Sequence, residues 1–242
     1  MCGRARLPTD YSEIRIAFKL GDAPAREGAH HKDGGPSAAP NLAPSWNIAP
    51  TQDMLCVILD GAGRRAAVKL RWGLIPRWAK EPKMKYPTFN AKAETVSELA
   101  SFRGAWKAGR RCLVVTGGFY EWRMKDKWPF AIACVNDALT VMAGLWEERT
   151  GPTGEVIRSC TVITTDANAL LAPIHNRMPV ILAPADWPAW LGETPAHEGA
   201  LKALLRPYPS EDMHVWPVGK RVGDVRNNDA GLVEKVEIPA VE

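Results

Sequence analysis

The chain has 242 residues, a length that allows one large domain or two small ones. Hydrophobic residues make up 46% of it, and its 20 glycines and 20 prolines stay below the roughly 25–30% that marks a disordered low-complexity chain. The formal net charge is +4, no apolar run reaches the ~18 residues of a membrane span, and the first residues lead into Pro8 and Asp10 instead of an apolar signal core, so we expect a cytoplasmic protein.

The apolar pattern predicts a series of short elements along the chain. A helix is expected at 11–18, followed by a long loop at 21–45 that is rich in Gly, Ala, Pro, Ser and His. Strands are expected at 54–59, 66–70, 112–116, 129–135, 139–143 and 156–164. Turns at 136–137 and 151–154 would each connect a hairpin. Helices are expected at 94–108, 166–171 and 196–205, with a short helical turn at 186–191.

The order of these elements indicates the fold class. Strands predominate, helices lie between them, and strand and helix do not alternate regularly. This arrangement favours an α+β fold around a bent or barrel-like sheet. No linker divides the chain and no internal repeat is present, so residues 1–242 are expected to form a single domain in which 21–45 is an insertion loop.

Positive charge is concentrated in one part of the chain. The segment 64–111 carries 13 Lys or Arg residues against three acids, a local balance of +10. Such segregation suggests a basic face for a polyanion. The alternative is a solvated surface on which charges of both signs mix once the chain folds.

The five cysteines are widely spaced, and no two of them form a CxxC pair. Four lie in apolar stretches and are expected to be small core residues: Cys56, Cys112, Cys134 and Cys160. Cys2 is the exception, because it is almost terminal and has polar neighbours. The His30-His31 pair lies in the Gly/Pro-rich loop without companion ligands, so no structural zinc site is expected.

Tryptophan is used preferentially, with 10 Trp against 5 Phe and 4 Tyr. In the stretch RWGLIPRW at 71–78, two indoles and two guanidiniums surround a proline bend. Aromatic rings interleaved with arginines suit single-stranded nucleic acid, whose bases stack while its phosphates pair with the cations. The alternative is that Trp72 and Trp78 are core residues.

Three polar residues stand in positions that packing alone does not require. Glu121 lies between Tyr120 and Trp122, where partial desolvation would suit a carboxyl group to proton transfer; a surface salt bridge is the alternative. His175 lies beside an Arg between two prolines, on a rigid bend, although a lone His is more often structural. Asn90 precedes the helix expected from residue 94 and could merely cap it, but Glu94 or Thr95 is closer.

Cys2 offers the most distinctive chemistry. If Met1 is removed, residue 2 presents an α-amine that titrates near ~7.7–8.0 and a thiol that titrates near ~8.5 on adjacent carbons. Such a 1,2-aminothiol reacts with an aldehyde in two steps, because the amine forms an imine and the thiol then closes a five-membered thiazolidine. An internal cysteine cannot do this, since its nitrogen is an amide. The alternative is that Cys2 follows the initiator by chance.

Taken together, these residues resemble the SOS response-associated peptidase (SRAP) family, whose members crosslink to abasic sites in single-stranded DNA. The matching segments follow one another along most of the chain, at 2–4, 47–52, 71–78, 90–95, 111–113, 118–122, 143–147, 161–165 and 175–182. No single segment is decisive, and the resemblance rests on all nine in order, including the cysteine at position 2 and the run Gly-Phe-Tyr-Glu-Trp at 118–122. The resemblance implies one domain with a mixed, barrel-like β core, peripheral helices and a groove that holds the N-terminus.

The resemblance also implies roles for individual residues. Cys2 corresponds to the crosslinking residue, and Asn90 to an Asn that orients the reacting sugar or the terminus. Glu121 corresponds to the acid that shuttles protons during imine formation and ring closure. His175 corresponds to the His that promotes opening of the abasic sugar and reversal of the crosslink.

Further positions correspond to those that line the DNA groove of the family: Arg4, Pro50, Trp78, Trp122 and Arg177. Lys92 stands where the family usually has Arg, which keeps the charge but loses the bidentate fork for phosphate. Residues 115–117 also depart from the commoner family pattern, so the segment before Glu121 is less well defined. The loop 21–45 matches no family motif.

The sequence therefore predicts a DNA-repair protein that captures the open-chain aldehyde of an abasic site on Cys2. It would act as a monomer on single-stranded DNA, with no membrane, metal or nucleotide cofactor involved. One rival is a cysteine peptidase in which Cys2, His175 and Glu121 act on an acyl group, and removal of Met1 by self-processing could coexist with DNA capture. Another is a non-covalent binder of single strands that uses the Trp/Arg groove alone.

Overall fold

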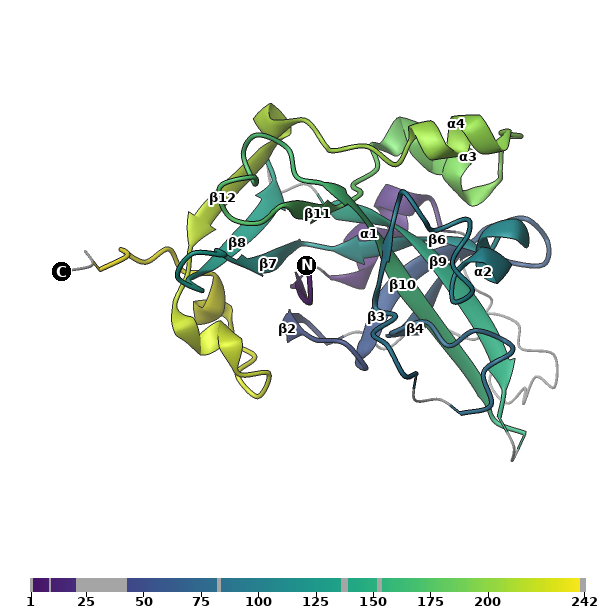
Figure 1. Cartoon of the computed structure of the whole chain (residues 1–242), viewed down its shortest axis with the longest axis horizontal. Helices are drawn as coiled ribbons and strands as arrows, with labels where there is room; N and C mark the ends of the chain where they lie inside the picture. Colours follow the sequence, from purple (N-terminus) through teal and green to yellow (C-terminus); the bar gives the residue numbers. More distant parts are fainter. Residues whose placement is uncertain are drawn as a thin grey trace.

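Five strands of the chain close into a small barrel (Figure 1). The computed structural model describes residues 2–8, 10–20, 43–81, 84–135, 139–151 and 154–239. The barrel strands are β3 (Asp53–Leu59), β4 (Arg65–Trp72), β6 (Arg111–Thr116), β9 (Thr140–Thr150) and β10 (Val156–Asp166). Around the barrel the order is β3, β6, β9, β10, β4 and back to β3; β4 and β10 run parallel and the other pairs run antiparallel.

Strand β10 carries two short strands beyond the barrel. β5 (Asn90–Lys92) pairs with it in parallel, with Asn90 opposite Val162, and β11 (Arg177–Pro179) pairs with it antiparallel, with Arg177 opposite Asp166. The end of β10 that has left the barrel thus holds together two segments that are far apart in the sequence.

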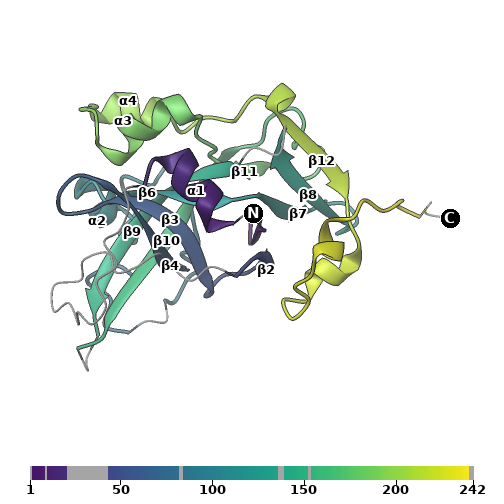
Figure 2. The same cartoon turned by 180° about the vertical axis from the view of Figure 1, so that it is seen from behind.

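A second, five-stranded antiparallel sheet lies beside the barrel (Figure 2). Its order is β12 (Met213–Pro217), β8 (Pro129–Cys134), β7 (Gly118–Trp122), β1 (Arg4–Leu7) and β2 (Ser45–Ile48). Strand β7 begins at Gly118, whose φ is +141°, and a Cβ there would lie 2.5 Å from the main-chain oxygen of Ile132. Glycine is therefore required where the chain passes from the barrel to this sheet. The N-terminal end of β1 lies between the sheet and the barrel in both views.

The helices are short and peripheral. They are α1 (Tyr11–Phe18), α2 (Arg103–Lys107), α3 (Trp187–Leu191) and α4 (Glu198–Ala203), with 3-10 turns at Pro184–Asp186, Ser210–Asp212, Lys220–Gly223 and Ala230–Val233. Helix α1 starts where the Asp10 carboxylate accepts a hydrogen bond from the main-chain N–H of Ser12 at 2.7 Å. It buries Ile14 and Phe18, and the Phe18 ring stacks on Trp187 with centroids 4.5 Å apart. Capping and one apolar face therefore anchor the helix to the core.

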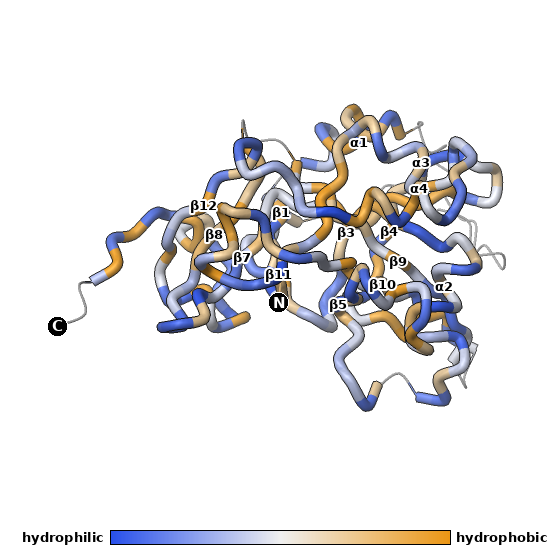
Figure 3. The backbone as a smooth tube through the Cα atoms, turned by 45° about the horizontal axis from the view of Figure 1, so that its top comes forward, coloured by the Kyte–Doolittle hydropathy of each residue, from blue (hydrophilic) through white to orange (hydrophobic). Residues whose placement is uncertain are grey.

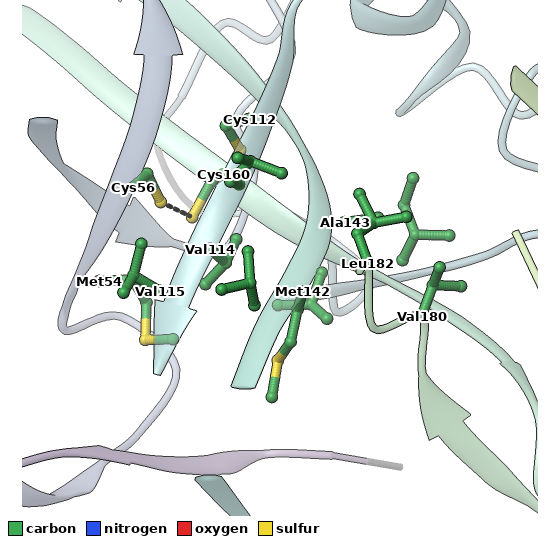
Figure 4. Close-up of a cluster of buried hydrophobic side chains, with 14 of the residues drawn as sticks. Met54, Cys56, Cys112, Val114, Val115, Met142, Ala143, Cys160, Val180 and Leu182 are labelled. Carbon is green, nitrogen blue, oxygen red and sulfur yellow. Dashed lines mark hydrogen bonds between the residues drawn. The ribbon is translucent and has the colours of Figure 1, made fainter. Parts of the chain in front are cut away.

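Hydrophobic segments, coloured orange in Figure 3, run through the barrel and also through the second sheet around β8. Figure 4 shows the cluster inside, where Cys56 donates a hydrogen bond to the Cys160 sulfur at 3.9 Å, close to Cys112. These three thiols and Cys134 are buried, so the prediction that they are core residues is confirmed. Burial raises the pKa of Cys112, which keeps it a protonated, inert core thiol.

The predicted strands, the helix at 11–18 and the short helices near 186–191 and 196–205 are confirmed, within two residues at each end except in β9, which continues to Thr150 instead of ending at 143. The hairpin at 151–154 is confirmed as well, because Thr150 on β9 pairs with Val156 on β10. The α+β class with a barrel-like β core is thus correct. Within the described residues, no helix is long and apolar enough to span a bilayer.

Two helix predictions are wrong. Of the helix expected at 94–108, Arg103–Lys107 alone is helical, because the chain leaves β5 through successive turns at 93–99. At 166–171 the structure has turns, in which the Asn168 carboxamide oxygen accepts the main-chain N–H of Leu171 at 3.0 Å. A side chain that bonds its own backbone competes with helix formation.

The turn expected at 136–137 and the loop expected at 21–45 both differ from the prediction, and both fall partly outside the described residues. Strands β8 and β9 do not pair across 136–137, because β7 and β12 occupy both edges of β8; residues 136–138 themselves lie outside the described residues. The loop expected at 21–45 ends earlier, since Ser45 already belongs to β2, and 21–42 also lie outside the described residues. The strands not predicted, β1, β2, β5, β7, β11 and β12, have three to five residues each.

Candidate functional site

Cys2 lies two residues before Arg4, the first residue of β1, which β7 and β2 flank in the five-stranded sheet. Its side chain is 1% exposed, and its main-chain oxygen accepts a hydrogen bond of 2.6 Å from the Asn90 side-chain nitrogen. The Cys2 thiol lies 3.8 Å from the main-chain oxygen of Arg4. Although it is almost terminal, Cys2 is thus held in place and shielded from solvent, contrary to what its polar neighbours suggested.

Asn90 reaches Cys2 from the other part of the molecule. Parallel pairing with Val162 fixes its backbone on β5, and the preceding main-chain oxygen of Phe89 accepts hydrogen bonds from Val162 N–H at 3.0 Å and from the Trp72 indole at 2.8 Å. The Asn90 carboxamide oxygen is buried and accepts no hydrogen bond from the described residues. The side chain therefore presents one used donor and one available acceptor next to the N-terminus.

Glu121 lies in β7, one residue beyond Tyr120, which pairs with Arg4. It therefore lies inside a strand and not at a strand end. Its side chain is 6% exposed, and one carboxylate oxygen accepts the main-chain N–H of Trp122 at 3.2 Å. Burial, and then the Glu121 carboxylate, raise the pKa of the Cys2 thiol well above its usual range. The thiol is therefore protonated at neutral pH.

His175 lies on the segment that leads into β11. Its Nδ1 accepts the main-chain N–H of Arg177 at 3.0 Å, so the neutral ring carries its proton on Nε2. Burial lowers the pKa of His175, and the Glu121 carboxylate acts in the opposite direction. Because Glu121 influences both Cys2 and His175, and Asn90 bonds Cys2, all four residues predicted as catalytic lie at one place, between the barrel and the second sheet.

Arg4 has a different environment from the one predicted. Its guanidinium donates to the Asn47 side-chain oxygen at 2.8 Å and to the main-chain oxygens of Val222 at 2.5 Å and Gly223 at 2.9 Å. Its charge also lies over the Trp122 ring, 5.8 Å from the centroid. Arg4 therefore links β1 to the C-terminal region, and much of its donor capacity is used within the protein.

Asn47 is a residue of this environment that the sequence analysis did not select. It is 2% exposed, and its side-chain nitrogen donates to the main-chain oxygens of Val222, Asp224 and Asn227 at 3.2, 3.0 and 2.9 Å. It lies in the segment 47–52 that resembles the SRAP family. A polar residue before an apolar pair was the available signal, but its partners lie about 175 residues away in sequence.

Arg177 is similarly engaged. It forms ion pairs with Glu94 at 2.7 Å and Asp166 at 2.8 Å, and it donates to the main-chain oxygen of Thr164 at 2.6 Å. Its hydrogen bonds lower the pKa of Glu94. The Arg177 side chain is 11% exposed, so it ties β11 to the segment after β5 and presents little of its charge to solvent.

The remaining residues predicted to bind DNA are more accessible. Trp78 is 62% exposed, and its indole N–H donates to the main-chain oxygen of Ala100 at 3.1 Å. Lys92 is exposed on β5, two residues after Asn90. Pro50 and Trp122 are half-buried. Trp72, by contrast, is fully buried, which confirms the alternative that it is a core residue.

Part of the positive charge of the segment 64–111 is neutralised within the protein. Several of its arginines are paired with acids, at Arg64 with Asp60, Arg65 with Glu193 and Arg110 with Glu147. Among the described residues of this segment, the exposed cations that form no ion pair are Lys69, Arg77, Lys80, Lys85, Lys92, Arg103 and Lys107. Within the part of the chain that the structure describes, no group of three His, Cys, Asp or Glu side chains is arranged to hold a metal ion.

Comparison with known proteins decides the family. The family model described as SOS response associated peptidase (SRAP) matches residues 1–225. The chain belongs to this family. The resemblance noted from the sequence motifs is therefore confirmed, over almost the whole chain.

Relatives in the SRAP family carry related names. "Abasic site processing protein YoqW" of Bacillus subtilis (strain 168) is 39% identical over 237 residues, which cover 97% of this chain and 99% of the relative. "Abasic site processing protein HMCES" of Xenopus tropicalis is 33% identical over 266 residues, which cover 94% of this chain and 76% of the relative. A crystal structure of a Bordetella bronchiseptica protein is similar with a TM-score of 0.74 and 25% identity, over 90% of this chain and 100% of that chain.

Proposed function

We propose that this SRAP protein processes abasic sites in DNA by capturing their open-chain aldehyde on Cys2 after Met1 has been removed. The observation that carries the proposal is that Cys2 is buried and accepts a hydrogen bond from Asn90 in the same site as Glu121 and His175. A held N-terminal cysteine in the same site as a carboxylate and a neutral imidazole has the groups that aminothiol chemistry needs. The names of the relatives support the abasic site as the target.

The proposed reaction balances as a condensation. The Cys2 amine adds to the aldehyde carbon and gives a carbinolamine, which takes up a proton on its hydroxyl and loses water to form the imine. The thiol sulfur then adds to the imine carbon, its proton passes to the nitrogen, and the thiazolidine closes. One water molecule leaves in total, and no oxidant or reductant takes part.

Proton transfer is the part for which the neighbouring residues are suited. Glu121 would supply the proton that lets water leave. The Cys2 thiol is protonated at neutral pH, so ring closure needs a base, and the neutral His175 or the Glu121 carboxylate can accept that proton. The Asn90 acceptor would orient the amine or the sugar.

The environment of the thiol favours this chemistry over acyl transfer. A nucleophilic cysteine of a peptidase is activated by a lowered pKa, whereas burial and Glu121 raise the pKa of Cys2. The amine of Cys2 would be the first nucleophile, and the thiol would add to an imine already formed. A free amine at residue 2 is therefore the requirement that separates the two candidates.

The test is adduct formation with abasic single-stranded DNA, followed by denaturing electrophoresis. Wild-type protein should give a denaturation-resistant adduct, and mass spectrometry of that protein should show Met1 absent. Cys2→Ala should give no stable adduct, although borohydride should trap its transient imine. The proposal is overturned if Cys2→Ala forms the heat-stable adduct in full yield, or if protein that retains Met1 crosslinks equally well.

A duplex with the same lesion serves as the comparison substrate, because an abasic site in single-stranded DNA is the proposed target. We expect faster adduct formation with the single strand. Sedimentation of the protein alone and with DNA tests the expectation that it acts as a monomer.

A further inference from the structure

A groove of about 300 Å³ opens next to the candidate site. One wall is Pro50 and Thr51, the floor is 71–73, and the other wall is 84–89. A volume near 300 Å³ is at the lower end of what small-ligand sites offer. None of the sites predicted from the sequence includes the second wall.

The groove is joined to Asn90 by backbone and ring contacts. Phe89, the last residue of the second wall, directly precedes Asn90, and the Trp72 indole donates to its main-chain oxygen at 2.8 Å. The rings of Trp72 and Phe89 meet edge to face with centroids 6.1 Å apart, and Thr51 N–H bonds the Trp72 oxygen at 2.8 Å. The floor and the inner end of the groove are therefore rigid and fixed relative to the residue that holds Cys2.

The outer end of the groove presents an aromatic ring and cations. Tyr86 is 69% exposed, an unusual position for a large ring, and the Lys85 ammonium lies 5.5 Å from its centroid. Arg71 lines the floor and donates from Nη1 to the main-chain oxygen of Gly73 at 3.0 Å. Among the described lining residues there are two cations and three aromatic side chains, and there is no carboxylate.

This composition fits one nucleotide of a single strand. A base stacks on an exposed aromatic ring regardless of its identity, and the phosphate attached to it requires a cation within a few ångströms. The Lys85–Tyr86 pair supplies both at that spacing. Because the groove ends at Phe89, a strand whose abasic nucleotide lies at Cys2 and Asn90 would bring its neighbouring nucleotide into the groove.

We propose that this groove holds the nucleotide that neighbours the abasic nucleotide, with its base stacked on Tyr86 and its phosphate paired with Lys85 and Arg71. This inference rests on the proposed function and deepens it. Tyr86 would thus select an unpaired neighbour, since a base stacked on a protein ring is withdrawn from its duplex. The groove gives a physical basis for preferring single-stranded DNA around the lesion.

The experiment uses a strand that contains a tetrahydrofuran analogue of the abasic site, which has no aldehyde, and 2-aminopurine either 5′ or 3′ of it. Binding is measured by anisotropy and stacking by 2-aminopurine fluorescence, for wild type, Tyr86→Leu and Tyr86→Phe. We expect Tyr86→Leu to weaken binding about 5- to 150-fold, the range that corresponds to 1–3 kcal/mol per stacked base. Quenching at one of the two positions should fall in Tyr86→Leu and persist in Tyr86→Phe.

The cation is tested by the salt dependence of the same binding. Lys85→Ala should make the slope of log K against log salt shallower by about 0.7, the contribution of one phosphate contact on a single strand. Lys202→Ala is the matched control, because Lys202 is an exposed lysine on α4 that pairs with Glu198 at the surface, and its slope should equal that of wild type. Tyr86 and Lys85 are exposed, so the melting temperatures of their variants should stay unchanged.

Separate outcomes would overturn the proposed function and the assignment of the groove. If wild type forms no adduct with aldehyde-bearing DNA, the proposed function is wrong. If wild type forms the adduct but Tyr86→Leu binds and quenches as wild type does, the proposed function stands and the groove inference is wrong. Equal salt slopes for wild type and Lys85→Ala would likewise overturn the assignment of the phosphate contact.

Discussion

The Asn90 side-chain nitrogen donates a 2.6 Å hydrogen bond to the main-chain oxygen of Cys2, a residue 88 positions away in the sequence. This bond connects the second sheet, which contains β1, to β10 of the barrel through β5. The position of the N-terminal cysteine therefore depends on how the two sheets are assembled.

Asn90→Asp removes the donor and places a carboxylate against the Cys2 oxygen. A buried acceptor left without its donor costs about 1–3 kcal/mol, so we expect adduct formation to slow about 5- to 150-fold. The measurement is a single-turnover time course with abasic single-stranded DNA. Asn168→Asp serves as a control, because Asn168 also bonds main-chain groups, those of Tyr208 and Leu171, and has no hydrogen bond to Cys2 among the described residues. If both variants slow the reaction equally, a general loss of stability explains the effect.

Glu121→Gln keeps the shape of the side chain and removes its ability to exchange a proton. We expect adduct formation to slow by the 10²–10⁴-fold typical of general acid–base catalysis. Borohydride trapping separates the steps, because the variant should accumulate less imine per unit time than wild type. Wild-type rates in Glu121→Gln would mean that the carboxylate is only structural and that water supplies the proton.

His175→Ala should slow the release of a preformed adduct and leave the final yield high, because we assign His175 to opening of the sugar ring and, in reverse, of the thiazolidine. The measurement is a chase in which excess unlabelled abasic DNA is added and exchange of the label is followed. Exchange as fast as that of wild type would show that His175 has another role.

The pH dependence of exchange follows from the lowered pKa of His175, which lies below the usual value of 6.5. The neutral ring is the base, and its folded-state pKa is depressed, so the neutral form persists as pH falls through 6.5. We therefore expect exchange to stay constant down to about pH 6.5 and to decline only at lower pH, as the ring takes up a proton. His175→Ala should lack this acidic limb. Because the pKa of His175 is lower in the folded than in the unfolded protein, protonation of the ring disfavours the folded state. The contribution of His175 to stability is therefore complete above about pH 6.5 and is lost at lower pH.

Arg4→Ala and Lys92→Ala should change different properties, the first the stability of the protein and the second the salt dependence of DNA binding. Arg4 donates to Asn47, Val222 and Gly223, so its loss should lower the free energy of unfolding by about 1–3 kcal/mol. Lys92 is exposed, so Lys92→Ala should leave stability unchanged and make the salt slope of DNA binding shallower by about 0.7. Urea unfolding and binding titrations at several salt concentrations measure the two effects. A stable Arg4→Ala with a shallower slope would restore Arg4 as a phosphate contact.

Local patterns were sufficient for much of the fold. Each of the barrel strands contains an apolar or alternating stretch long enough to show a pattern, and α1 has both a capping Asp and one apolar face, so the sequence alone predicts them. The short strands β1, β5, β7 and β11 were missed because a three- to five-residue run has no measurable period, and only the pairing partner defines it as a strand.

The ordered motifs that identify the family, and the aminothiol on which the proposed chemistry depends, are properties of the covalent chain and are visible before it folds. The tertiary structure decided which groups are free to act. Arg4 and Arg177 carry the same charge as Lys85 and Lys92, yet the first two are occupied by partners from distant segments and the last two are exposed. Charge and hydrogen-bond partners act over a few ångströms in space, and residues 218 positions apart, such as Arg4 and Val222, become neighbours only when the sheets assemble.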